Sequence, residues 1–349
     1  MDLIELDGSH GEGGGQLLRT ALSLSVLLRK PFRITNIRAK RPSPGLRAQH
    51  LACVQALAEL SNAEVEGAEL HSIEFCFTPL ELKAGGVFKF DIKTAGSTLL
   101  LLQALLPPLV FARSKTVLEL QGGTCARFAP PQLYLQRVFL PAVAKMGLRA
   151  EINVEKWGWF PKGGGILKAE VQRASQLTAF DCNARRALRS IDCIAASSNL
   201  PVHVAQRMSA TASKSLSSFA VPVKTETVDA PSLGVGAMFF VQANYENSCA
   251  GFTSIGEIGV PAEKVALDSC NAFTAFNASG AAVDERLSDQ IALYCALAKG
   301  RSVFSTPRLS NHLQSNLWVI QQFLPVHFEV EEKNGVFQLS VDGTGFGSK

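Results

Sequence analysis

The sequence lacks the features that are typical of membrane, disulfide-rich and zinc-binding proteins. Its eight cysteines include no C-x-x-C pair, so we expect neither a zinc site nor a disulfide framework. The longest apolar run, 99–112, is interrupted by a glutamine and two prolines and is too short to span a bilayer. Acidic residues near the first methionine do not fit a signal peptide. We therefore expect a cytoplasmic protein with no membrane partner.

Charged and aromatic residues are also scarce, at 18% and 8% of the chain, whereas apolar residues make up 47%. This composition excludes a disordered protein and favours a packed globular one. The net charge of +4 is too small to predict nucleic-acid binding by itself. A local cluster within fifteen residues carries more information, because it could bind phosphates or form a solvated face. The cluster consists of Arg33, Arg38, Lys40, Arg41 and Arg47.

Glycine, by contrast, is concentrated near the N-terminus. Residues 8–15 contain five glycines around Glu12, and Arg19 follows one helical turn into an apolar segment. Such a loop before a helix can present backbone N–H groups to an anion, and a metal ion could bridge Glu12 to a phosphate. The spacing fits neither the P-loop nor the dinucleotide fingerprint. A tight turn with a solvated Glu12 is the alternative.

The apolar periodicity predicts an α/β (α+β) fold in which a β-α-β-α-β-β unit of about 80 residues occurs three times. We expect these units to form one large domain. In the first unit we predict strands at 4–6, 32–37, 63–65 and 73–77 and helices at 15–28 and 48–60. In the second unit the predicted strands are 88–92, 117–120, 149–154 and 166–171 and the helices 97–112 and 131–146. In the third unit the predicted strands include 176–180, 326–331 and 336–341, and the helices are one from about 284 and one at 311–323.

The third unit is interrupted by about 100 residues between its first strand and its first helix. This segment has a strand pattern at 237–243 and a helix pattern at 261–272. We therefore predict a small α/β domain at 183–280, inserted into a large catalytic domain of residues 1–182 and 281–349. Ligand pockets are frequent at such domain junctions.

Two of the six histidines occupy corresponding positions, since His50 and His312 each lie in the first turn of a predicted helix. A helix N-terminus opposes protonation, so such an imidazole can stay neutral and act as a nucleophile, although a capping role is more common. Asp289 and Gln290, near another helix start, either cap the helix or form hydrogen bonds with a ribose or purine edge.

Taken together, the motifs resemble those of the RNA 3′-terminal phosphate cyclase family. The matching segments follow one another along nearly the whole chain, which makes the resemblance specific. They are Gly11-Glu12-Gly13-Gly14-Gly15-Gln16-Leu17-Leu18-Arg19, Ile37-Arg38-Ala39 with Arg41 and Pro44-Gly45-Leu46, Gln49-His50-Leu51, Thr94-Ala95-Gly96-Ser97, Gly122-Gly123-Thr124, Phe160-Pro161-Lys162-Gly163-Gly164-Gly165, Asp289-Gln290 and His312.

The resemblance implies an ATP-dependent enzyme that uses Mg²⁺ or Mn²⁺ to convert an RNA 3′-phosphate into a 2′,3′-cyclic phosphate. It implies His312 as the nucleophile that receives AMP from ATP, and Glu12 as a metal ligand. The resemblance is compatible with a homodimer. The residues implied for the adenylate are Gln103, Arg286, Leu287, Ser288, Asp289, Gln290 and, as a stacking partner, Phe252; those for the substrate phosphate are Arg19, Arg38, Arg41 and His50.

Four positions depart from the family pattern: Cys125, Trp157, Ala237 and Arg286. They concern the stacking of the base and the contacts with RNA, and none of them removes the nucleophile. Two alternatives remain at this point. One is a non-catalytic RNA-binding relative that acts in ribosome assembly, against which the presence of His312 argues. The other is an enolpyruvyl transferase on a related triplicated fold.

Overall fold

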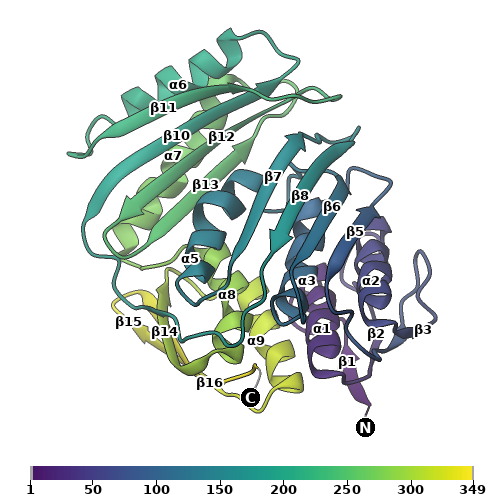
Figure 1. Cartoon of the computed structure of the whole chain (residues 1–349). Coiled ribbons are helices and arrows are strands. Elements are labelled where there is room, and N and C mark those ends of the chain that lie inside the picture. Colours follow the sequence, from purple (N-terminus) through teal and green to yellow (C-terminus); the bar gives the residue numbers. More distant parts are fainter. Residues whose placement is uncertain (1–2, 348–349) are drawn as a thin grey trace.

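The strands of the chain form four sheets of four strands each in the computed structural model, which describes residues 3–347. Helices pack against these sheets, so the predicted α/β class is confirmed. In Figure 1 one sheet with its two helices lies at the top of the view, and the other three sheets surround a group of helices below it.

The first sheet contains β1 (Ile4–Asp7), β2 (Phe32–Thr35), β3 (Glu64–Glu66) and β4 (Phe75–Thr78) in the order β1-β2-β4-β3. Strands β1 and β2 are parallel, and the other two pairings are antiparallel. Helix α1 (Gly15–Leu28) connects β1 to β2, and α2 (Ala48–Ser61) connects β2 to β3. The eleven consecutive buried residues of α1 place it inside the molecule.

The second sheet has the same order and the same pairing directions. Its strands are β5 (Gly86–Asp91), β6 (Thr116–Gly122), β8 (Gly165–Val171) and β7 (Ala150–Lys156), with β5 and β6 parallel. Helix α3 (Thr98–Val110) follows β5. The helix predicted at 131–146 forms as three consecutive helical segments, α4 (Gln132–Tyr134), η1 (Leu135–Phe139) and α5 (Leu140–Ala144).

The third sheet repeats this order with β9 (Asp181–Cys182), β14 (Lys299–Thr306), β16 (Val336–Thr344) and β15 (Phe328–Lys333). Helix α8 (Glu285–Leu297) precedes β14, and α9 (Asn311–Phe323) follows it. The strand predicted at 176–180 is wrong, because only Asp181 and Cys182 pair with β14 as a ladder. The preceding backbone instead donates hydrogen bonds to separate carbonyls, as Thr178 does to Met146 over 2.9 Å.

The fourth sheet lies between β9 and α8 in the sequence. It contains β10 (Leu188–Ser198), β11 (Val223–Asp229), β12 (Gly236–Tyr245) and β13 (Cys249–Ile255) in the order β11-β10-β12-β13. Helices α6 (His203–Ser215) and α7 (Ala262–Ser279) pack against it. Alternation along β12 gives the sheet two apolar faces. Phe239 belongs to a core shared with α6 and α7, whereas Met238 and Phe240 belong to the larger core of the rest of the molecule.

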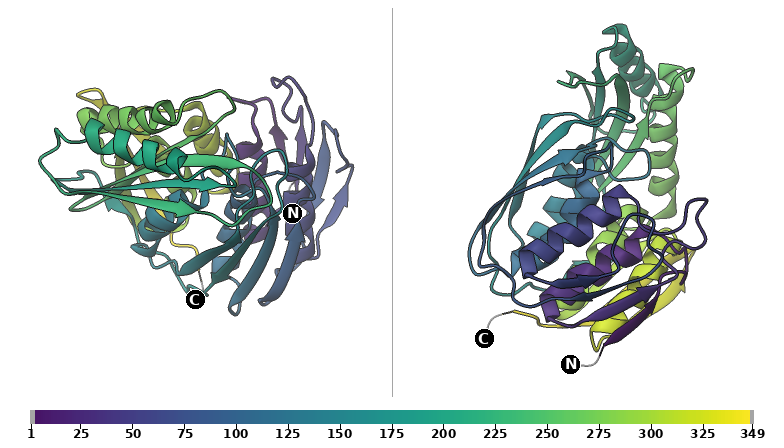
Figure 2. Two further views of the ribbon diagram at one scale, coloured as in Figure 1. Left: turned by 90° about the horizontal axis from the view of Figure 1, so that it is seen from above. Right: turned by 90° about the vertical axis from the view of Figure 1, so that its right-hand side faces the viewer.

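Helices α1, α3, α8 and α9 lie at the centre of the larger part, where α1 packs against both α3 and α9 (Figure 2). Each of the parallel strands β1, β2, β5 and β14 is followed by a loop that leads into one of the helices α1, α2, α3 and α9. Ligand sites form preferentially at such carboxyl ends of strands. No helix within residues 3–347 has both the length and the apolar character that crossing a membrane requires.

Candidate functional site

The glycine-rich loop after β1 packs against the first turns of α9, about 300 residues away in the sequence. The Glu12 backbone N–H donates to Ser315 Oγ over 3.2 Å. Gly11 has a φ of +57°, and a Cβ at this position would collide with the same hydroxyl. His10 stacks on Trp318 with ring centroids 3.9 Å apart. Glycine is therefore required where the loop meets α9, and this contact brings Glu12 to the start of that helix.

Glu12 lies between a histidine and an arginine. Its Oε2 is 2.8 Å from His312 Nδ1, and its Oε1 pairs with the Arg41 guanidinium. The two atoms are in contact but are not aligned as in a hydrogen bond, so Oε2 is a buried oxygen with no hydrogen-bond partner within residues 3–347. Because Nδ1 faces the carboxylate, Nε2 is the nitrogen of His312 that is free to react.

The surroundings of His312 favour its neutral form. Burial lowers the pKa of the imidazole below 6.5, and the positive charges of Arg19, Arg41 and Arg286 lower it further. Ser310 caps α9 by accepting a hydrogen bond from Leu313 N over 3.1 Å, so the histidine sits in the first turn of a well-formed helix. The side chain remains 52% exposed, which leaves it accessible. A neutral, accessible imidazole surrounded by arginines can act as a nucleophile towards an anionic phosphate.

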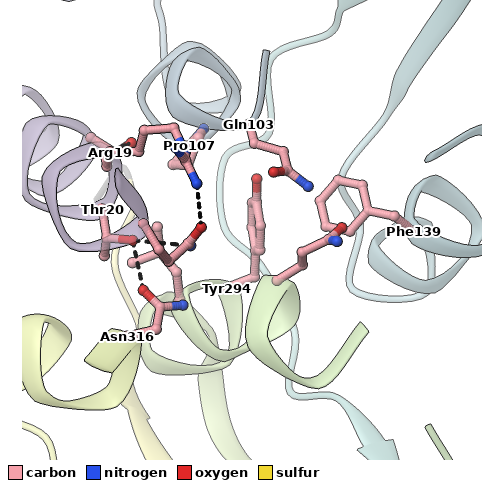
Figure 3. Close-up of a pocket in the computed structure, with 11 residues that line it drawn as sticks. Arg19, Thr20, Gln103, Pro107, Phe139, Tyr294 and Asn316 are labelled. Carbon is pink, nitrogen blue, oxygen red and sulfur yellow. Dashed lines mark hydrogen bonds between the residues drawn. The ribbon is translucent and has the colours of Figure 1, made fainter. Parts of the chain in front are cut away.

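Arg19 lies beside this centre and is only 7% exposed. It donates to Gln16 Oε1 over 2.8 Å, and the next residue, Thr20, donates to Asn316 Oδ1 of α9 over 2.6 Å (Figure 3). The carboxylate that interacts electrostatically with the Arg19 guanidinium is that of Asp289. A guanidinium that is buried without a direct carboxylate contact is suited to an anionic ligand.

A cavity of about 30 Å³ opens next to Arg19. Two side-chain amide atoms in it are buried without hydrogen-bond partners among the described residues: Gln103 Nε2, a donor, and Gln290 Oε1, an acceptor. The cavity is large enough for water but not for a whole nucleoside, so only part of a ligand could enter it. Its lining residues are Gln16, Arg19, Thr20, Ser23, Gln103, Pro107, Phe139, Gln290, Leu293, Tyr294 and Asn316.

His50 lies under the glycine loop in the first turn of α2 and is 4% exposed. Its Nδ1 accepts a hydrogen bond from the Arg47 backbone N–H over 3.2 Å, so the neutral ring carries its proton on Nε2. A Cβ on Gly15 would collide with that Nε2 atom. Burial and the charges of Arg19, Arg38 and Arg47 lower the pKa of His50 to about 3. His50 is therefore a neutral donor next to the loop and not a second cation.

The arginines of the loop after β2 have different surroundings. Arg41 reaches Glu12, whereas Arg38 Nη1 donates to the carbonyls of Ser43 and Gly45 over 2.8 and 2.9 Å. Arg38 thus stabilises the loop that carries Arg41. The sequence predicted a phosphate contact for both, but it could not indicate that one of them would be engaged by its own loop.

Helix α8 brings the predicted adenylate residues to the same region. Asp284 caps it by accepting hydrogen bonds from Arg286 N and Leu287 N, and Tyr134 OH donates to the same carboxylate over 2.7 Å. Leu287 and Ser288 are buried behind the site. Burial raises the pKa of Asp289 to about 8. The sequence-based prediction missed Tyr134, Ser315 and Asn316; only the last two had a signal, their position next to His312 on one helix.

Phe252 is not brought to this group. Its ring packs against Phe273 and Phe276 of α7, with centroids 6.1 and 5.4 Å apart. Its neighbour Gly251 faces Tyr134 and Asp284 on the other side of β13. Since successive residues of a strand point to opposite faces, Phe252 points away from the site.

Three of the departures from the family pattern also lie elsewhere, at the contact between the second and fourth sheets. Trp157 N donates to the Pro231 carbonyl over 2.7 Å, Cys125 Sγ lies 3.8 Å from Met238 Sδ of β12, and Ala237 is buried on β12. None of these three residues is among the charged groups that act on His312. Arg286, in contrast, contributes charge next to His312.

No group of three or more His, Cys, Asp or Glu side chains that could hold a metal ion occurs within residues 3–347. Mg²⁺ needs fewer protein ligands, because it is commonly held by one or two carboxylates together with substrate phosphates and water. Glu12 Oε2, which is buried next to His312 Nδ1 and has no hydrogen-bond partner among the described residues, is the carboxylate oxygen in this group that fits such a role.

Comparison with known proteins identifies the family of this chain. The family model described as RNA 3′-terminal phosphate cyclase matches residues 10–330. Among solved structures, the enolpyruvyl transferase NikO from Streptomyces tendae covers 61% of this chain and 38% of its own, at 18% identity and a TM-score of 0.27, a likeness too small to support an argument.

Curated relatives with the same description as the family model match over nearly the whole chain. The proteins from Nostoc punctiforme, Methylococcus capsulatus and Pyrobaculum neutrophilum are 38%, 40% and 40% identical to it. The alignments cover 96%, 93% and 98% of this chain and 98%, 91% and 99% of the relatives. The chain therefore belongs to the RNA 3′-terminal phosphate cyclase family.

Proposed function

We propose that this protein uses ATP to convert an RNA 3′-terminal phosphate into a 2′,3′-cyclic phosphate, with His312 as the covalent nucleophile. The observation that carries the proposal is the juxtaposition of His312 with Glu12 and the cationic side chains of Arg19, Arg41 and Arg286. Family membership supports the reaction class, because the curated relatives are described as cyclases of this kind.

In the proposed first step, His312 Nε2 attacks the α-phosphorus of ATP. A P–N bond forms, the P–O bond to the β-phosphate breaks, and pyrophosphate leaves. Glu12 keeps Nδ1 turned away from the phosphorus, and the arginines neutralise the charge that develops on the phosphoryl oxygens. The low pKa of His312 supports this step, since the attacking nitrogen then needs no prior loss of a proton at neutral pH.

In the second step, an oxygen of the RNA 3′-phosphate attacks the phosphorus of the histidine-bound AMP, and the P–N bond breaks. The RNA then ends in an activated phosphoanhydride. The adjacent 2′-hydroxyl attacks the 3′-phosphorus, loses its proton and releases AMP, which closes the cyclic phosphate. The reaction requires a ribonucleotide at the end, because DNA lacks the 2′-hydroxyl. The neutral Nε2–H of His50 next to the glycine loop is suited to donate to a substrate phosphate oxygen.

Glu12 Oε2 fits a divalent cation such as Mg²⁺ or Mn²⁺, since it is buried and lacks a hydrogen-bond partner. When bound, the ion would neutralise charge on the phosphates of ATP. Gln103 and Gln290 are suited to the nucleoside, because an unpaired donor and an unpaired acceptor in one cavity match a ligand edge that carries both.

We further propose that the shared order of the first three sheets reflects triplication of one unit, with residues 183–280 inserted into the third. The free state of all eight thiols supports a reducing compartment, and we propose the cytoplasm.

Incubation with α-³²P-labelled ATP and Mg²⁺ or Mn²⁺ tests the covalent step. We expect acid-labile label on the protein, loss of that label in His312→Ala, and unchanged labelling in the control His203→Ala, which alters an exposed histidine on α6. Undiminished labelling of His312→Ala would refute the nucleophile. A 3′-phosphorylated RNA that becomes resistant to phosphatase after incubation would identify the cyclisation. Absence of label on the wild-type protein would instead favour the non-catalytic RNA-binding alternative.

A further inference from the structure

Several large apolar side chains are exposed on loops where the second and fourth sheets meet. The side chain of Phe128, after β6, is 90% exposed, and that of Phe160, between β7 and β8, is 78% exposed. Leu233 and Val235 of the loop before β12 and Ile258 of the loop after β13 are also exposed. Monomeric proteins rarely gather such side chains without a partner.

Hydrogen bonds and an ion pair hold these loops in position. Lys162 Nζ donates to the Leu233 carbonyl over 3.3 Å, and Arg127 forms a 3.1 Å ion pair with Glu257. Under Phe160, the buried Trp159 donates through Nε1 to Ser198 Oγ over 2.8 Å. The exposed side chains are therefore held by buried contacts and can act as a preorganised surface.

This surface is continuous with the candidate site. A Cβ on Gly163 would lie 2.9 Å from Ala95 Cα, so the loop after Phe160 rests directly on the loop after β5. In that loop, Ser97 N donates to Gln49 Oε1 over 3.2 Å. Gln49 precedes His50, whose imidazole lies under the glycine loop. The loop that carries Phe160, the loop after β5 and the first turn of α2 thus connect Phe160 to the glycine loop of the site.

The surface also carries basic side chains. Lys93 and Lys162 are exposed on the two touching loops, and neither ammonium forms an ion pair with a carboxylate of the described residues. Arg127 lies over the Phe128 ring at 5.4 Å. Proteins that hold single-stranded nucleic acid without sequence preference combine exposed aromatic rings, on which bases stack, with cations along the backbone.

We infer that the RNA strand leaves the site across these loops, with a base stacked on Phe160 and its backbone near Lys93 and Lys162. The inference rests on the proposed function, since it starts from a 3′-terminal phosphate at the arginines around His312. A polymer whose end lies there must continue over the protein surface, and the chain of contacts above leads to Phe160.

Binding of 3′-phosphorylated RNA, measured by fluorescence anisotropy with the full chain, tests the path. We expect Phe160→Ala to weaken binding of a twelve-nucleotide strand by about fivefold or more, which corresponds to the lower limit for one stacked base. We expect Phe160→Ala to bind a dinucleotide as tightly as the wild-type protein does. Phe160→Trp should bind the twelve-nucleotide strand with an affinity close to that of the wild type. Lys162→Ala should lower the salt dependence of binding. Val87→Ala, which shortens an exposed side chain on β5, is the matched control.

Equal affinity of Phe160→Ala, Lys162→Ala and the wild-type protein for the long strand would overturn the inference. Weakening by Phe160→Ala of long and short strands alike would also overturn it, because the effect would then lie at the terminal nucleotide. Labelling by ATP separates this outcome from failure of the proposed function. The inference requires normal histidine-linked label in Phe160→Ala, whereas failure of the proposed function removes the label from the wild-type protein as well.

Discussion

Replacing His50 by glutamine should make the protein less sensitive to acid. Glutamine at the third position of a helix can accept the hydrogen bond from the Arg47 backbone N–H that His50 accepts now, so the start of α2 keeps its cap. The folded protein holds the His50 imidazole neutral with a pKa of about 3, whereas the ordinary value in the unfolded chain is 6.5. Between these values the unfolded state binds a proton that the folded state does not.

The sign and size of the effect follow from this difference. Stability contributed by the neutral ring is present above pH 6.5 and is lost as the pH falls towards 3. One pKa unit corresponds to about 1.4 kcal/mol, so at pH 4.5 the wild-type protein should have lost about 3 kcal/mol relative to pH 7 because of this residue. His50→Gln cannot lose this contribution, since glutamine does not titrate.

Urea unfolding of both proteins at pH 7 and pH 4.5, followed by circular dichroism and tryptophan fluorescence, measures the difference. We expect the difference in the free energy of unfolding between variant and wild type to shift by about 3 kcal/mol in favour of the variant at the lower pH. The control is His203→Gln, a substitution at an exposed histidine on α6 that is measured in the same way at both pH values. A pH-independent gap for His50→Gln would show that His50 is not held neutral by burial, and would refute the reasoning.

Two other predictions concern the same site. Burial raises the pKa of Asp289 from 3.8 to about 8, so the stability that the neutral carboxyl contributes is present below about pH 4 and is lost as the pH rises towards 8, because the unfolded chain ionises there first. Asp289→Asn, which does not titrate, should therefore gain thermal stability relative to the wild type between pH 4 and pH 9, and a melting-temperature difference that is the same at both pH values would contradict this. Gly11→Ala combines a positive φ with a collision against a hydroxyl of α9, so it should destabilise the protein by about 2 kcal/mol or more and slow labelling by ATP. The control Gly335→Ala, also at a positive φ but in open space, should destabilise the protein by only about 1 kcal/mol and label normally. Equal labelling of the two variants would count against a role for the contact between the glycine loop and α9.

Local patterns were sufficient to predict most of the fold. Helix starts at Asp284 and Ser310 could be anticipated from capping residues, and the helices α1 and α9 have the predicted bounds. Such elements depend on neighbours within a few residues, so the chain itself specifies them. The segment 176–180 was mispredicted because its backbone bonds to partners distant in the sequence, which local alternation does not reveal.

The sequence by itself determined which residue types are available for the chemistry: a glycine loop with Glu12, several arginines, and a histidine in the first turn of a helix. Only the tertiary structure decided which of them meet. It brought Glu12 to His312, left Arg38 to bind its own loop, buried His50 as a neutral ring, and turned Phe252 towards α7. The physical reason is that capping and periodicity act within one element, whereas these contacts depend on how α1, α2, α8 and α9 pack around a common centre.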